Sequence, residues 1–212
     1  MPVSDVYCKL LNRILVGDAP PGSSLQENTL AAEFSVSRTP IREALIRLEA
    51  DGLVRIVPKQ GVYVTEITHQ NYRNAFEVRY HMISIAGQLA AQRISDVEIE
   101  KLRQIATEIT TLSEPRDIKL QDMGFHTYLN CATHNPMLAE SLRRLSYFMP
   151  RLETLTPADV DYFRTIGADL VEIVKALSAR DATRTASLLQ AHITKYREHI
   201  NKLSEIVDPS AI

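Results

Sequence analysis

The sequence predicts a mainly α-helical protein, in which an N-terminal winged helix-turn-helix precedes an antiparallel bundle of about six helices. Two observations support this fold class. The first part of the chain combines short helical patterns with an alternation of β-branched residues. Beyond it, apolar residues recur at helical spacing almost to the end of the chain, and the connections are short. We therefore expect one domain over residues 1–68 and a second over residues 69–212.

Capping and turn residues divide the first segment into three helices and two strands. Ser24 with Glu27 forms a capping-box pattern, Ser37 is placed to cap the next helix, and Gly61 permits a tight hairpin. The expected elements are helices over 3–16, 24–34 and 37–52 (caps included) and strands over 53–57 and 62–67. Two short helices joined by a turn and followed by a hairpin form a winged helix-turn-helix.

In the second segment most of the helices have a recognisable first turn. Ser95 and Glu98 form another capping-box pattern, and Asn135 and Thr156 each stand before a Pro at the first helical position. Asp181 is placed to cap the last helix. The helices are expected over 68–93 and then from about residues 95, 115, 135, 156 and 181, the last one reaching about residue 206.

The composition limits the class of protein. The chain has 212 residues and a formal net charge of −2, so it has no overall positive field that would attract nucleic acid. It has no apolar run of the roughly 18 residues that span a bilayer, and its two cysteines, Cys8 and Cys131, are too few for a disulfide framework. We expect a cytoplasmic protein with no membrane partner, in which any DNA binding depends on a local cluster of residues.

Such a cluster stands at the start of the second helix of the pair. Arg38 and Arg42 are four residues apart and share a helix face, and guanidinium groups bind guanine edges and phosphates. Ser37 and Thr39 add hydroxyl groups, and the helix N-terminus attracts phosphate. An alternative is that the two arginines form a solvated face paired with nearby glutamates. The coincidence of cap, turn and wing favours DNA binding.

The segment PPGSSLQENTLAAEFSVSRTPIREALIRLEADGLVRIVPKQGVYV resembles the N-terminal DNA reader of GntR-type bacterial transcription regulators. This resemblance implies that Arg38, Thr39 and Arg42 contact bases and the DNA backbone, with Ser37 beside them. It also implies that Gln60 and Gly61 form the tip of the wing. Position 28, often Arg in such regulators, is Asn28 in this chain.

The rest of the chain resembles the helical effector domain of the FadR/FCD branch of that superfamily. The matching segments are FEVRYHMISIAGQLAAQR (76–93), DMGFHTYLNCATHNPML (122–138) and IVKALSARDATRTASLLQAHI (173–193). This resemblance implies that Arg79 reaches a binding pocket and pairs with a small anionic organic effector.

A metal site is the second implication of this resemblance. Asp122 and His126 share a helix face, and a carboxylate with an imidazole suits Zn²⁺, Ni²⁺ or Mn²⁺. By resemblance His192 is a third ligand, but the position of the fourth is occupied by Leu170. Asp169 differs from it in helical direction by about 100° and is not expected to substitute. The alternative is a pocket without metal, in which these polar residues bind the effector directly.

Together these features predict a ligand-responsive transcription regulator. We expect a homodimer on a short palindromic double-stranded DNA operator, acting as a repressor that a small organic acid releases. One alternative is a metal-dependent enzyme, because Asp122, His126 and His192 form a two-histidine, one-carboxylate set. Another is an architectural DNA-binding protein that responds to no ligand.

Overall fold

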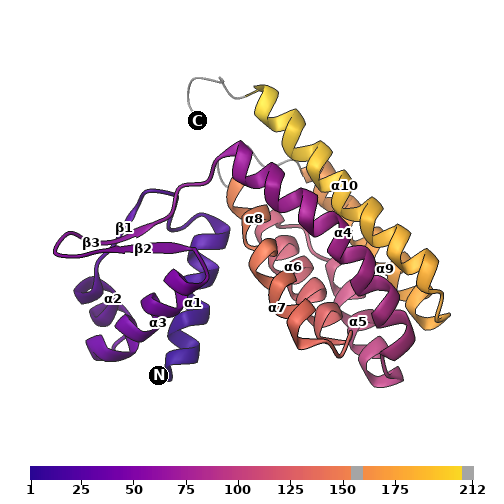
Figure 1. Cartoon of the computed structure of the whole chain (residues 1–212), viewed down its shortest axis with the longest axis horizontal. Coiled ribbons are helices and arrows are strands. Elements are labelled where there is room, and N and C mark those ends of the chain that lie inside the picture. The colour runs from indigo at the N-terminus through magenta and orange to yellow at the C-terminus, as the bar shows by residue number, and fades with distance from the viewer. Residues whose placement is uncertain (154–159, 207–212) are drawn as a thin grey trace. The chain divides into compact units, whose positions relative to one another are not determined.

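The computed structural model describes residues 1–153 and 160–206 and shows a mainly helical chain in two compact units (Figure 1). The first unit contains Met1–His69 and a short stretch that begins at Pro150. Its elements are α1 (Val3–Val16), β1 (Ser24–Leu25), α2 (Glu27–Glu33), α3 (Arg38–Ala50), β2 (Val54–Val57) and β3 (Gly61–Val64). The helices of the remaining chain are α4 (His69–Arg93), α5 (Asp96–Ile109), α6 (Pro115–Cys131), α7 (Pro136–Ser146), α8 (Phe148–Glu153), α9 (Val160–Ser178) and α10 (Ala182–Ile206).

Helices α1 and α3 form the core of the first unit. Leu10 and Ile14 of α1 are buried, as are Ile41, Leu45 and Leu48 of α3. This confirms the apolar face predicted for α3. Burying one such side chain contributes about 1.5–3 kcal/mol, so the core fixes which face of α3 is left for solvent.

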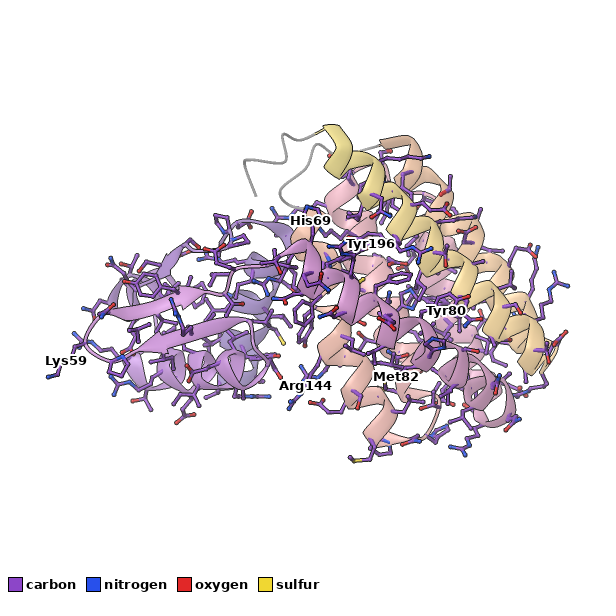
Figure 2. The ribbon with its side chains drawn as sticks, turned by 45° about the horizontal axis from the view of Figure 1, so that its top comes forward. Lys59, His69, Tyr80, Met82, Arg144 and Tyr196 are labelled. Carbon is purple, nitrogen blue, oxygen red and sulfur yellow. The ribbon has the colours of Figure 1, made fainter. Side chains whose placement is uncertain are left out.

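The wing is a three-stranded antiparallel sheet with the order β1-β3-β2. In the β2–β3 hairpin Val57 pairs with Gly61, and Lys59 and Gly61 have positive φ angles of 63° and 128°. A residue without a Cβ tolerates the latter conformation best, which explains the glycine. Figure 2 shows Lys59 at the far end of this hairpin.

The predicted cap at Ser24 is wrong. Ser24 lies in β1, where it pairs with Tyr63, and α2 begins after Gln26 without a side-chain cap. The physical reason is that pairing with β3 supplies backbone hydrogen bonds, which a local capping pattern cannot reveal. Ser37 does occupy the N-cap position of α3, but its hydroxyl makes no capping hydrogen bond.

The caps of the second unit are largely as expected. Ser95 and Glu98 form a complete capping box, and the Asn135 side chain accepts a hydrogen bond from the Leu138 backbone at 3.2 Å. The Asp181 carboxylate accepts one from the Arg184 backbone at 2.9 Å. The cap expected at Thr156 lies outside the described residues. The short helix α8 was not expected.

Packing in the second unit brings together helices that are distant in sequence. Helix α9 packs on α5 and α10, and α6 packs on α5 and α7. Helix α4 approaches α10 closely at Gly87, where an added Cβ would lie 3.0 Å from the backbone of Ala186. This packing carries α4, α6, α9 and α10 to one region of the bundle, where α6 and α10 supply the cluster described below and α4 and α9 supply residues beside it. None of the described helices is long and apolar enough to cross a membrane.

Candidate DNA interface and effector site

The N-terminal end of α3 presents the predicted DNA-contacting residues to solvent. Ser37, Arg38 and Thr39 are all exposed at the start of the helix, ahead of the buried Ile41, Leu45 and Leu48. The Arg42 side chain is 69% exposed, and its Nε lies 3.3 Å from a carboxylate oxygen of Glu27 on α2. Such an exposed ion pair contributes little energy, so Arg42 can exchange this carboxylate for a phosphate.

The tip of the wing is also exposed. Gln60 and Gly61 lie at the turn of the hairpin, and the Tyr63 hydroxyl donates to the Gln60 carbonyl at 3.2 Å. Asn28 on α2 is exposed as well. The structure therefore leaves every predicted DNA contact of the first unit accessible.

The second unit contains a cluster of three residues with metal-ligating side chains. Asp122, His126 and His192 each offer one ligand atom, and these atoms lie within 4.8 Å of one another. The Asp122 carboxylate oxygen Oδ1 is 3.3 Å from His192 Nε2 and 3.8 Å from His126 Nε2. Helices α6 and α10 thus bring together His126 and His192, which are 66 positions apart in the sequence.

The atoms of this cluster lack other partners. Among the described residues, the buried Asp122 Oδ1 and both ring nitrogens of His126 have no hydrogen-bond partner. Buried polar atoms are normally satisfied, so a convergent carboxylate and two imidazoles fit a bound cation once His192, whose pKa is about 9, has lost its proton. The Asp122 side chain is 21% exposed, which leaves a route from solvent to the cluster.

The two histidines have different electrostatic surroundings. Burial lowers the pKa of His126 to about 3; the Asp122 carboxylate opposes this shift and the nearby Arg79 adds to it. Burial also acts on His192, but Asp122 and Asp169 outweigh it and raise the pKa of His192 to about 9. For Asp122, burial opposes the shift, but the neighbouring His126, His192 and Arg79 hold the pKa below its usual value.

Asp169 has a position that the sequence did not predict. Its carboxylate lies 3.5 Å from His192 Nδ1 and accepts a hydrogen bond of 2.6 Å from Lys195 Nζ. Asp169 is not part of the cluster of Asp122, His126 and His192, and Leu170 is fully buried. Asp169 instead contacts the ring nitrogen of His192 on the side away from Asp122. Helical direction alone excluded a ligand role for Asp169, and no sequence signal indicated this supporting contact.

Arg79 on α4 is buried close to the same cluster. It is 5% exposed, and its Nε has no hydrogen-bond partner among the described residues. Burial lowers the pKa of Arg79, and the negative charge of Asp122 opposes this shift. A buried guanidinium with free donor capacity is suited to a carboxylate, which it can bind through two parallel hydrogen bonds.

The two parts of the chain define a class of protein. A winged helix-turn-helix with exposed arginines is a DNA-binding fold, and a helical unit with a buried cluster of polar side chains is suited to a small ligand. This combination is that of a ligand-responsive, DNA-binding transcription regulator. Comparison with known proteins places the chain within this class.

The chain belongs to the GntR family of bacterial regulatory proteins and carries an FCD domain. Residues 2–64 match the family model described as "Bacterial regulatory proteins, gntR family", and residues 74–195 match the FCD domain. Members of the family are transcription regulators, so the enzymatic alternative is not supported. FCD domains bind effectors and often metals, in agreement with the cluster found here.

Curated relatives match nearly the whole chain. The HTH-type transcriptional repressor RspR of Escherichia coli is 25% identical over 96% of this chain and 91% of its own length. The Nta operon transcriptional regulator of Aminobacter aminovorans is 30% identical over 88% of this chain and 87% of its own. Among solved structures, E. coli McbR/YncC has the same fold, with a TM-score of 0.84, 20% identity and coverage of 96% and 97%.

Proposed function

We propose that this protein is a homodimeric repressor that binds a short palindromic operator and leaves it when a small organic acid binds the second unit. The observation that carries the proposal is the exposed set Ser37, Arg38, Thr39 and Arg42 on the solvent face of α3. We further propose that residues 1–68 form the DNA-binding domain and residues 69–212 the effector and dimerisation domain. Such a regulator acts in the cytoplasm, where bacterial DNA lies.

On DNA, the N-terminal end of α3 enters the major groove, as the second helix does in helix-turn-helix proteins. Arg38 and Arg42 bind guanine edges or phosphates through their guanidinium groups, and Thr39 contributes a hydroxyl. Gln60 and Gly61 bring the wing close to the adjacent backbone. Because one such helix reaches few bases, two copies on a palindrome supply the affinity and specificity of an operator.

In the second unit, Arg79 binds a carboxylate of the effector from within the protein. Asp122, His126 and His192 would hold a divalent cation such as Zn²⁺, Ni²⁺ or Mn²⁺. Such a cation would supply a positive charge for an oxygen of the effector. Asp169 orients His192, and Arg79 fixes the orientation of the acid.

The direction of regulation rests on two relatives. RspR of E. coli is a transcriptional repressor, and the gluconate operon transcriptional repressor of Bacillus licheniformis is 31% identical over 63% of this chain. The effector releases the DNA if it binds more tightly to one particular arrangement of the dimer. In that arrangement the distance between the two DNA-binding domains does not match the operator.

The test is DNA binding by an Arg38→Ala variant. DNA is first selected from a random pool by the unmodified protein, and affinity is then measured by fluorescence anisotropy. Losing a bidentate base contact worth about 1–3 kcal/mol weakens binding by roughly 5- to 150-fold. Arg103→Ala, which removes another exposed arginine on α5, is the matched control and leaves the affinity unchanged. Full affinity in the Arg38→Ala variant would refute the proposed DNA contact.

A further inference from the structure

Two arginines are buried in the described part of the chain, and only one of them belongs to the proposed effector site. Of the arginines and lysines whose exposure the structure describes, Arg79 and Arg151 alone are buried, at 5% and 2% exposure. A buried charge costs free energy unless it is paired or hydrogen-bonded, so such residues are rare. Arg151 on α8 is therefore the buried charge that the proposed function leaves unexplained.

Arg151 binds the residue that follows the wing. Its Nη2 atom donates hydrogen bonds to the backbone carbonyl of Thr65 and, at 3.1 Å, to the Thr65 hydroxyl oxygen. Thr65 comes directly after β3, and both residues lie in the first unit, which includes the stretch from Pro150. Burial lowers the pKa of Arg151 to about 10, and the nearby Glu66 opposes this shift, so the guanidinium is charged at neutral pH. A charged donor makes these hydrogen bonds stronger than neutral ones.

Thr65 in turn holds the chain that leaves α3. Its hydroxyl donates to the backbone carbonyl of Gly52 at 2.8 Å, and its backbone N–H donates to the carbonyl of Leu53 at 3.0 Å. Gly52 and Leu53 come directly after Asp51, the C-cap of α3. One threonine therefore accepts hydrogen bonds from α8 and donates hydrogen bonds to the end of α3.

The first half of α8 is bound to the helix that carries His192. The Tyr196 hydroxyl donates to the backbone carbonyl of Met149 at 2.5 Å, within the second unit. Met149 precedes Arg151 by two residues, so the boundary between the two units falls inside this short helix. Tyr196 follows His192 by four positions, about one turn along α10. Helix α8 is thus hydrogen-bonded to α10 through Met149 and to Thr65 through Arg151.

Tyr196 also lies near the proposed effector site. Burial lowers the pKa of Arg79, and among the groups that oppose this shift Asp122 acts most strongly, followed by Tyr196. The Tyr196 side chain, labelled in Figure 2, is therefore close to the guanidinium that binds the effector in the proposed function. A phenol O–H donates one hydrogen bond, and a carboxylate is a stronger acceptor than a neutral carbonyl. An acid bound at Arg79 would compete with the Met149 carbonyl for the Tyr196 hydroxyl.

We propose that α8, with the hydrogen bonds of Tyr196 and Arg151, is a strut between the effector site and α3, and that the effector releases it. This inference rests on the proposed function and adds the route by which the acid acts. Without effector, the Tyr196 bond to Met149 keeps α8 in place. Arg151 then holds Thr65, and this arrangement binds the operator. When the acid takes the Tyr196 hydroxyl, α8 loses its hydrogen bond to α10, and the arrangement that binds DNA becomes less populated.

Two conservative variants test the strut, because each removes hydrogen bonds and little volume. Tyr196→Phe lacks only the hydroxyl, so it reproduces without ligand the hydrogen-bond loss that the acid causes. Arg151→Met keeps an unbranched stem but has no donor, and replacing a buried charge by an apolar residue is often neutral for stability. Tyr80→Phe, which removes a hydroxyl from α4, is the matched control. Circular dichroism and unfolding midpoints verify that these variants fold.

The decisive measurement is DNA affinity by fluorescence anisotropy, with DNA selected by the unmodified protein. Tyr196→Phe and Arg151→Met each weaken binding by about 2- to 12-fold, the factor that one net hydrogen bond contributes. The double variant binds no more weakly than the weaker of the two single variants, because either change already breaks the same strut. Tyr80→Phe keeps full affinity. Effects that multiply in the double variant, or full affinity in either single variant, would overturn the proposal.

Hydrogen exchange of the full chain without DNA gives a second readout. The Thr65 amide is protected by its hydrogen bond to Leu53. Tyr196→Phe raises the exchange rate of this amide, although Tyr196 and Thr65 belong to different units. The Tyr80→Phe control leaves the rate unchanged. An exchange rate at Thr65 that is the same in Tyr196→Phe and in the unmodified protein contradicts the strut.

These experiments distinguish the strut from the proposed function. If the unmodified protein selects no DNA but Tyr196→Phe still speeds exchange at Thr65, the strut stands and the proposed function is wrong. If DNA binding requires Arg38 but is unaffected by Tyr196→Phe, the proposed function stands and the strut is wrong.

Discussion

His126 and His192 belong to one buried cluster, yet their pKa values move in opposite directions. His126 has no carboxylate of its own besides the Asp122 that both histidines share, and burial keeps it neutral. His192 lies between Asp122 and Asp169, and these two carboxylates keep its pKa near 9. The same residue type therefore provides a neutral ligand at one position and a protonated ring at the other.

This difference predicts a pH-dependent metal affinity. His126 is deprotonated above a pKa of about 3, but His192 must lose a proton before its ring binds a cation, because its pKa is about 9. We expect Zn²⁺ affinity to rise about tenfold for each pH unit from pH 6.5 to about 9 and then to level off. Competition with a chelator of known pH dependence measures it. A Zn²⁺ affinity that does not change between pH 6.5 and about 9 would contradict the pKa that we assign to His192.

Asp169 supplies a second prediction about single residues. A carboxylate on the outer ring nitrogen of a metal-bound histidine orients the ring and raises its basicity. We expect Asp169→Asn to weaken Zn²⁺ binding by about 10- to 100-fold above about pH 9, where His192 is deprotonated in both proteins, because losing such a partner has effects of that size. Glu172→Gln, which alters an exposed carboxylate one turn along α9, is the matched control. Equal affinities in the two variants would show that Asp169 has no orienting role.

Among the elements, local signals in the sequence identified the helices whose first backbone N–H groups are capped by a side chain of the same turn. Ser95 with Glu98 and Asn135 were predictable because a cap involves residues three positions apart. Strand β1 was not, because Ser24 and Leu25 become a strand only by pairing with Tyr63 and Val62. A two-residue strand has no periodicity that a sequence could display.

Two helical glycines test how elements pack. A Cβ at Gly87 would lie 2.9 Å from Leu189 Cδ1 and 3.0 Å from the Ala186 backbone, so α4 and α10 would have to separate. A Cβ at Gly124 would meet nothing within 4 Å. We expect Gly87→Ala to destabilise the protein by about 1–3 kcal/mol and Gly124→Ala to stabilise it by about 0.5–1 kcal/mol. Urea unfolding measures both, and shifts of the same sign would refute the packing account.

On the scale of the whole molecule, the residues that we propose for DNA binding and for effector binding lie in different units. Arg38 belongs to the first unit and Arg79 to the second. We expect Arg79→Ala to retain the DNA affinity of the unmodified protein but to lose its response to the effector, since only the buried guanidinium is removed. Anisotropy titrations with selected DNA, in the presence of small mono- and dicarboxylic acids chosen by thermal shift, measure this. If Arg79→Ala releases DNA in response to the acid just as the unmodified protein does, Arg79 does not belong to the effector site.

Arg38→Ala provides the converse control at this scale. It should bind the same acid as the unmodified protein, measured by calorimetry, although its affinity for DNA is lowered by roughly 5- to 150-fold. In the unmodified protein the coupling is reciprocal, so saturating DNA must weaken acid binding by the factor by which the acid weakens DNA binding.

From the sequence we predicted the two-part architecture, the exposed start of α3 and the three residues of the buried cluster, Asp122, His126 and His192. The first two predictions depend on local periodicity and capping patterns, and the third on a helical spacing of four residues together with the family resemblance. The tertiary structure alone decided that Asp169 supports His192, that Ser24 joins a sheet and that Arg79 is buried beside Asp122. These features depend on helices and strands separated in the chain, whose distances are set by packing and not by spacing in the sequence.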